Sequence, residues 1–198
     1  MSRRLSALLI LLLLLAGIGA GAFWYARTAW TAPGPLTQPA QVVVPRGGTA
    51  AIAEALAERG VIADPRAFLV AATVTRGQGP LRAAEFLFPA GASLRDVLEI
   101  LREGRIVQRR LTIPEGLTAR QIAAVLERAE GLTGEMPEVT EGAILPETYS
   151  YQWGDTRAAV VRRATQAMEQ ALAEIWRERA PNLPLQSPRE ALILASIV

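Results

Sequence analysis

Apolar residues are distributed in two ways along this sequence, as one long N-terminal run and as short periodic stretches after it. No charged residue lies between Leu5 and Ala26, and Leu8 to Leu15 is entirely aliphatic. A helix over residues 5–26 would reach about 33 Å, against a hydrocarbon core of roughly 30 Å. The pattern therefore predicts a transmembrane helix over 5–26, preceded by a cytoplasmic tail of residues 1–4.

The flanks of this run predict its orientation. Arg3 and Arg4 precede it and keep the N-terminus in the cytoplasm, while the aromatic residues 23–25 suit the outer interface. A cleaved signal peptide is the alternative, because residues 20–22 (AGA) resemble a processing site. We expect a retained anchor in the cytoplasmic (inner) membrane, single-pass, with a Pro-rich extended spacer over 27–40 and a periplasmic or extracellular C-terminal region.

Short strands and amphipathic helices follow residue 40. Residues 41–44 are β-branched and predict a strand, and Thr49 is expected to cap a helix that ends near Arg59. Asp64-Pro65 predicts the start of a second helix. That helix is expected to turn three residues inward: Phe68, Leu69 and Val70. The order up to residue 88 is strand–helix–helix–strand, and the fold class is α+β.

One turn pattern occurs three times: an apolar residue, Pro, any residue, Gly, any residue, and Ser or Thr. Its copies are Val44–Thr49, Phe88–Ser93 and Ile113–Thr118, each before an amphipathic helix. Pro fixes φ, Gly takes an unusual backbone angle, and the hydroxyl caps the helix. Good capping explains each copy alone, so the repetition indicates architecture rather than chemistry. Between Thr156 and Arg179, apolar residues at helical spacing predict a helix on the core or at a domain seam.

The residue types that the sequence lacks exclude several kinds of catalytic chemistry. The sequence has no Cys, His or Lys, which excludes thiol nucleophiles, Ser-His pairs, Schiff-base lysines and the usual zinc ligands. Acid–base chemistry must come from Glu, Asp or Tyr, and we expect neither cofactor nor metal. Without Arg3, Arg4 and Arg27 the rest carries 18 arginines against 19 acidic residues, so its net charge is −1 and nucleic acid is set aside.

Two resemblances follow from these motifs. The strand–helix–helix–strand unit, residues 41–110, resembles LysM domains, which bind the glycans of peptidoglycan. The turn at Arg110–Thr118, the segment Glu141–Tyr149 (EGAILPETY) and the segment Ser187–Val198 (SPREALILASIV) together resemble the YceG-like, or MltG, family of endolytic murein transglycosylases. The resemblance makes residues 111–198 the N-terminal part of the catalytic domain.

That resemblance implies a reaction. Such enzymes cleave the β-1,4 bond between N-acetylmuramic acid and N-acetylglucosamine without water, leaving a 1,6-anhydro end. One Glu protonates the bridging oxygen and then takes the proton of the C6 hydroxyl, so a single carboxyl group of raised pKa suffices. In the family this Glu directly follows the Ala-Ser-Ile-Val segment. We expect it beyond Val198, and the sequence as it stands to be inactive.

Four residues remain as candidates for glycan binding: Glu147, Tyr149, Tyr151 and Ser196. Glu147 is either a cleft carboxylate or a turn support. Tyr149 and Tyr151 alternate and share one face, as sugar platforms or as half-buried packing residues. Ser196 either orients a neighbour of the expected acid or bonds its own helix backbone.

The expected partners are peptidoglycan strands and the membrane, with peptidoglycan synthases as further candidates. A rival interpretation is a non-catalytic peptidoglycan-binding module or a scaffold of cell-wall synthesis. The residue that follows Val198 separates the two interpretations.

Overall fold

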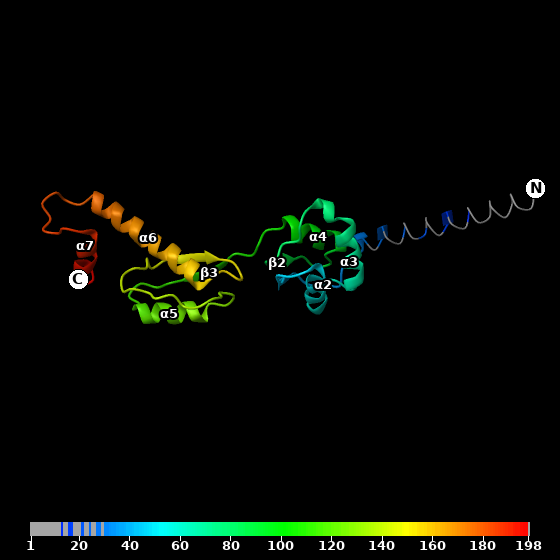
Figure 1. Ribbon diagram of the computed structural model, residues 1–198, viewed down its shortest axis with the longest axis horizontal. Helices are drawn as coiled ribbons and strands as arrows, with labels where there is room; N and C mark the ends of the chain where they lie inside the picture. Colours follow the sequence, from blue (N-terminus) through cyan, green and yellow to red (C-terminus); the bar gives the residue numbers. More distant parts are fainter. Residues whose placement is uncertain are drawn as a thin grey trace, which may run out of the picture. The chain divides into compact units, whose positions relative to one another are not determined.

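The computed structural model describes most of the chain after its N-terminal run, and it divides the chain into two compact units (Figure 1). The described residues are Leu13, Ala16, Gly17, Gly21, Trp24, Arg27, Thr28 and 30–197. Unit 1 ends at Ile106 and unit 2 begins at Val107. The predicted membrane span over 5–26 lies mostly outside the described residues. Among those that are described, no helix is both long and apolar enough to cross a bilayer.

From residue 40 onward, unit 1 contains a two-stranded antiparallel sheet and three α-helices. Its elements are β1 (Ala40–Val43), α2 (Thr49–Glu58), α3 (Pro65–Val74), the short 3-10 helix η1 (Arg76–Gln78), β2 (Glu85–Phe88) and α4 (Leu94–Glu103). β1 pairs with β2, with Ala40 opposite Phe88 and Val43 opposite Glu85. The predicted strand–helix–helix–strand order is therefore confirmed, as is the α+β class.

The core of unit 1 is built from the apolar faces of these elements. Phe68, Phe86 and Phe88 are fully buried, and the last two meet edge to face with ring centroids 6.4 Å apart. The expectation that Val70 points inward is wrong, because it is 65% exposed. Successive helical residues are about 100° apart, so a residue two positions after buried Phe68 falls on the opposite side of α3.

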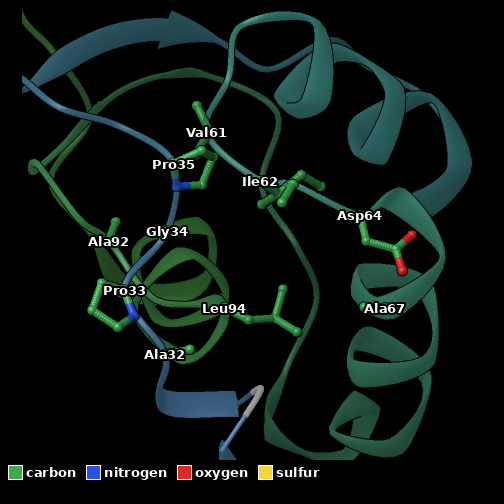
Figure 2. A pocket seen from close by; sticks show the side chains of 11 residues that line it. Ala32, Pro33, Gly34, Pro35, Val61, Ile62, Asp64, Ala67, Ala92 and Leu94 are labelled. Atoms are coloured by element: carbon green, nitrogen blue, oxygen red, sulfur yellow. The ribbon is translucent and has the colours of Figure 1, made fainter.

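The segment before β1 is held against unit 1, which differs from the free extended spacer expected there. Trp30 and Leu36 pack against the core. The Gly34 N–H donates to the Gly91 carbonyl at 3.2 Å, and the Gly91 N–H donates to the Leu36 carbonyl at 2.7 Å. Prolines lack N–H donors, so Gly34 supplies one between Pro33 and Pro35. This segment is part of the folded unit (Figure 2).

Two of the three repeated turns cap helices as predicted. Ser93 and Thr118 each form a reciprocal capping box, with Asp96 and Gln121 respectively. Hydrogen bonds from the Ser93 side chain and backbone hold the pKa of Asp96 below its ordinary value. The prediction fails for Thr49, because Gly48 is the N-cap and Thr49 is already helical. Gly is itself an accepted N-cap, and it occupies the position where the other copies have Ala or Leu.

Unit 2 has the same class and contains one much longer helix, α6, of 21 residues. Its elements are β3 (Arg109–Thr112), α5 (Ala119–Arg128), β4 (Thr148–Tyr151), α6 (Arg157–Arg177) and α7 (Pro188–Ala195). β3 and β4 pair antiparallel as a ribbon that contains the predicted boundary between residues 110 and 111. Ile113, Leu126, Val160 and Ala164 are buried together. Of the predicted α6 stripe only Val160 and Ala164 are fully in this core.

Candidate functional site

Polar side chains gather on one face of the β3–β4 ribbon. In this register Thr112 lies opposite Thr148, and Arg110 lies opposite Ser150. Because side chains alternate along a strand, these four residues share one face of the ribbon, here called the open face. The hydroxyl oxygens of Thr112 and Thr148 lie 2.9 Å apart. Thr148 is half-buried, and the other three are exposed.

The opposite face of the ribbon holds both candidate tyrosines. Tyr149 and Tyr151 are 8% and 5% exposed and belong to the core of unit 2. The Tyr149 hydroxyl donates to the Leu145 carbonyl at 2.7 Å, and the Tyr151 hydroxyl donates to the Glu130 carbonyl at 2.9 Å. The structure places them as packing residues with satisfied hydroxyls, which is the second of the two interpretations of the sequence.

Glu147 stands at the end of the ribbon, next to Thr148. Its backbone carbonyl accepts a hydrogen bond from the Ile113 N–H at 2.9 Å, while its side chain is exposed. Burial raises the pKa of Tyr149, and the nearby negative charge of Glu147 raises it further. Because side chains alternate along the strand, Glu147 belongs to the side of Tyr149 rather than to the open face, and its carboxylate is exposed at the end of the ribbon.

Ser196 lies elsewhere in unit 2, in the last turn of α7. It is exposed, and its hydroxyl donates to the carbonyl of Ile193 at 2.7 Å. Within the described part of the chain, no hydrogen bond joins Ser196 to Glu147 or to the two tyrosines. The structure thus brings Glu147, Tyr149 and Tyr151 onto one strand and its end, and it leaves Ser196 bonded to its own helix.

The loop before β4 nevertheless meets α7. A Cβ atom on Gly142 would lie 3.3 Å from Cδ2 of Leu192, and Gly142 has a φ of 71°. The Leu145 N–H donates to the Ala164 carbonyl of α6 at 3.3 Å. Two sequence segments about fifty residues apart, Glu141–Tyr149 and Ser187–Val198, are therefore neighbours in unit 2.

Three residues of the open face were missed by the sequence reasoning: Arg110, Thr112 and Ser150. Their signal is the alternation Arg-Leu-Thr in β3 and Thr-Tyr-Ser in β4, which puts polar residues on one side of each strand. The alternation alone does not pair the two strands, which lie 36 residues apart at Thr112 and Thr148. Finding the face requires the register.

A pocket in unit 1 is a weaker candidate (Figure 2). It encloses about 400 Å³ between residues 32–35, residues 61–64 and the start of α4. Asp64 is the one ionisable residue among those described in its lining, and its carboxylate accepts from the Arg66 N–H at 2.8 Å as the cap of α3. Ligand sites usually combine apolar walls with several converging polar groups, which this pocket lacks. In the described residues no cluster of acidic side chains could hold a metal ion.

Comparison with known protein families decides what this chain is related to. The model of the YceG-like family matches residues 42–198, from β1 through α7. This chain belongs to the YceG-like family. The match includes both units, the ribbon and the two neighbouring segments Glu141–Tyr149 and Ser187–Val198.

A solved structure shares the family name. The crystal structure of a yceG-like protein, lmo1499, from Listeria monocytogenes is similar to this YceG-like chain with 18% sequence identity and a TM-score of 0.39. The similarity covers 72% of this chain and 57% of that one, so the chain spans little more than half the length of lmo1499. A search of curated proteins finds no match.

Proposed function

We propose that this YceG-like protein is a membrane-anchored lytic transglycosylase that cuts nascent peptidoglycan strands and so limits their length. The observation that carries the proposal is the family match over residues 42–198, which includes both motif segments that meet at Gly142 and Leu192. The bond cleaved is the β-1,4 bond between N-acetylmuramic acid and N-acetylglucosamine. The product ends in a 1,6-anhydro sugar.

The chemistry needs one carboxyl group rather than two. Hydrolytic glycosidases place two carboxyl groups on either side of the bond, because one must activate water or attack the sugar. When the attacking oxygen is the C6 hydroxyl of the sugar itself, one Glu serves as acid and then as base. Its pKa must be raised by an apolar setting so that it holds a proton near neutral pH. We place this Glu directly after Val198, beyond the apolar α7 segment, as the resemblance to the family implies.

The open face is the part of unit 2 that we assign to the glycan. Threonine and serine hydroxyls both donate and accept, and the guanidinium of Arg110 donates several hydrogen bonds. These groups match the hydroxyl and acetamido oxygens of amino sugars. Glu147, exposed at the end of the same ribbon but outside the open face, stays a candidate acceptor for a glycan that extends past the ribbon. Tyr149 and Tyr151 support this face from below rather than stacking on sugar rings.

The membrane anchor is a second part of the proposal. Residues 5–26 would hold the folded units at the outer surface of the cytoplasmic membrane, where new strands emerge. This location would favour strands that have not yet been crosslinked.

A direct experiment tests the function. The full-length protein, including the residues that follow Val198, is reconstituted in vesicles and incubated with uncrosslinked glycan strands. Mass spectrometry is expected to find shorter strands with anhydro ends. Strands that remain uncut, but that cosediment with the vesicles, would overturn the enzyme and favour a binding module.

The binding module has support of its own in unit 1. The βααβ order with antiparallel β1 and β2 encloses a separate core, as expected of an independent module. Cosedimentation of the reconstituted protein with purified sacculi measures this activity. Binding that is unchanged by substitutions on the open face of unit 2 would place it in unit 1.

A further inference from the structure

The two helices of the βααβ part of unit 1 expose different chemistry. α2 and α3 are each ten residues long and bury residues in the same core. The exposed side of α2 carries Glu54 and Glu58, one helical turn apart. At the same spacing α3 exposes Val70 and Val74, which are 65% and 78% exposed.

The exposed side of α3 is here called the α3 outer face. It is defined by four exposed residues: Arg66, Val70, Thr73 and Val74. Leu69 and Thr73 form a shallow hollow with the two valines. Between residues 65 and 79 the sequence has two arginines, Arg66 and Arg76, and no acidic residue. Exposed apolar side chains can enter the boundary between headgroups and acyl chains, and arginines near a membrane surface are attracted to anionic lipids.

The C-terminal end of α3 lies beside the point where the chain joins unit 1. Arg102 of α4 donates to the Thr75 carbonyl at 3.1 Å and to the Thr75 hydroxyl at 2.7 Å. It also donates to the Gln78 side chain at 3.0 Å. Trp30, Gln78 and Arg102 line one surface hollow, together with Arg95, Leu98, Glu99 and Glu103 of α4. Arg102 thus connects Thr75, the residue after Val74, to the hollow that Trp30 lines.

Helical hydrogen bonds connect Trp30 to the residues before it. The Thr28 hydroxyl donates to the Trp24 carbonyl at 3.1 Å, the Thr31 hydroxyl donates to the Arg27 carbonyl at 3.2 Å, and the Ala32 N–H donates to the Thr28 carbonyl at 2.8 Å. The described residues between Trp24 and Thr31 are therefore helical up to the point where Trp30 packs against the core of unit 1. At about 1.5 Å per helical residue, Trp30 would lie roughly 6 Å beyond the end of a membrane span that finishes at residue 26.

We infer that the α3 outer face docks on the outer surface of the membrane that holds the anchor, with Val74 in the lipid and the flanking arginines among the headgroups. The inference rests on the proposed anchor over 5–26. The headgroup layer on each side of the hydrocarbon is about 5–7 Å thick, so a Trp30 roughly 6 Å from the span lies at its outer edge. Val74 then faces the same layer.

Docking need not be strong when the helix tethers it. A short connection raises the effective concentration of the face at the bilayer to the order of millimolar. Two valines and two arginines are then enough to bias the orientation of unit 1. The consequence for function is that the unit is held flat against the membrane rather than rotating about its anchor.

Single-cysteine labelling of the full-length protein tests this inference, because the sequence contains no cysteine. Val74→Cys is compared with Leu87→Cys, a matched control that is 53% exposed on the outward side of β2. Each variant carries a nitroxide and is reconstituted in vesicles that contain anionic lipid. The accessibility of the label to oxygen, which enters lipid, is compared with its accessibility to a water-soluble nickel complex.

The expected result is an oxygen-to-nickel ratio several-fold higher at Val74 than at Leu87. Equal ratios, with the protein still resistant to alkaline extraction, would overturn the docking and leave the anchor intact. A label at Val74 that is inaccessible to both oxygen and the nickel complex would also overturn the docking, because it would show that another protein covers α3. A chain that washes off the vesicles would refute the anchor and, with it, this inference.

Discussion

The carboxylate of Glu141 accepts a hydrogen bond from the backbone N–H of Ala119, with 3.0 Å between Oε1 and N. Ala119 is the first residue of α5, whose first N–H groups have no partner within the helix. The negative charge also faces the positive end of the helix dipole. A residue of the EGAILPETY segment thereby ties its loop to α5, although the sequence alone favours a solvated loop charge.

Substitution of Glu141 is expected to loosen this connection. Glu141→Ala removes both the acceptor and the charge, and should destabilise the start of α5 by about 0.5–1 kcal/mol. Glu141→Gln keeps an acceptor and should lose less. Hydrogen exchange of the first α5 amides measures the effect, and Glu138→Ala, an exposed carboxylate of the same loop, is the control. Equal exchange in all three variants would show that the contact adds nothing.

Gly34→Ala tests whether the Pro-rich segment is part of unit 1. A Cβ at this position would lie 2.2 Å from the Ala92 carbonyl oxygen, so the segment or the turn must move. We expect a loss of roughly 1–3 kcal/mol in the stability of unit 1, as for an overpacked site. Gly77→Ala is the matched control in unit 1, because its Cβ would meet no atom within 4 Å and Gly77 caps no helix. The midpoints of thermal unfolding of the two variants are compared. Similar midpoints would show that the Pro-rich segment is a free spacer rather than part of unit 1.

Tyr149→Phe is expected to alter the response of unit 2 to alkaline pH. Burial, with the charge of Glu147, raises the pKa of Tyr149 above its ordinary value of 10.0. The neutral phenol therefore stabilises the folded state below pH 10, and this contribution is lost as pH rises through the folded pKa. The variant should lose about 1 kcal/mol near neutral pH, with the hydrogen bond to Leu145. Above pH 10 its stability should fall less steeply than that of the natural protein, as measured by hydrogen exchange of β4.

Arg110→Ala tests the open face. Loss of a charged donor to a sugar oxygen should weaken glycan binding roughly tenfold. Arg110 is exposed, so stability should not change. Arg120→Ala removes an equally exposed arginine from α5 and serves as the control. Equal loss in both variants would mean that net charge, rather than the open face, holds the glycan.

Local chemistry was predictable from the sequence. Ser93 and Thr118 stand three residues before Asp96 and Gln121, and this spacing alone produces the two capping boxes. Thr49 occupies the same position in its turn as Ser93 and Thr118 do in theirs, yet the N-cap of α2 is Gly48. Gly47 has a φ of 157°, whereas the corresponding Gly91 and Gly116 have φ values of 65° and 76°, so the backbone before α2 follows a different path and the pattern of residue types is insufficient there.

Features that join distant residues were not predictable. The alternation of Tyr149 and Tyr151 indicates a shared face, but the core that α5 and α6 supply decides that this face is buried. The pairing of Thr112 with Thr148 spans 36 residues, and the bond from Ala119 to Glu141 spans 22. No local signal specifies either one, because both depend on how unit 2 closes around its core.

The central claim is cleavage of the glycan without water, and product analysis in heavy-oxygen water tests it most directly. The full-length protein, with the residues that follow Val198, is incubated with uncrosslinked glycan strands in this solvent. Mass spectrometry then measures the masses of the newly formed strand ends. Attack by the C6 hydroxyl predicts anhydro ends that carry no heavy oxygen and lack the mass of one water. New reducing ends that carry heavy oxygen would contradict the account, because they would show that water, activated as in an ordinary glycosidase, had attacked the sugar.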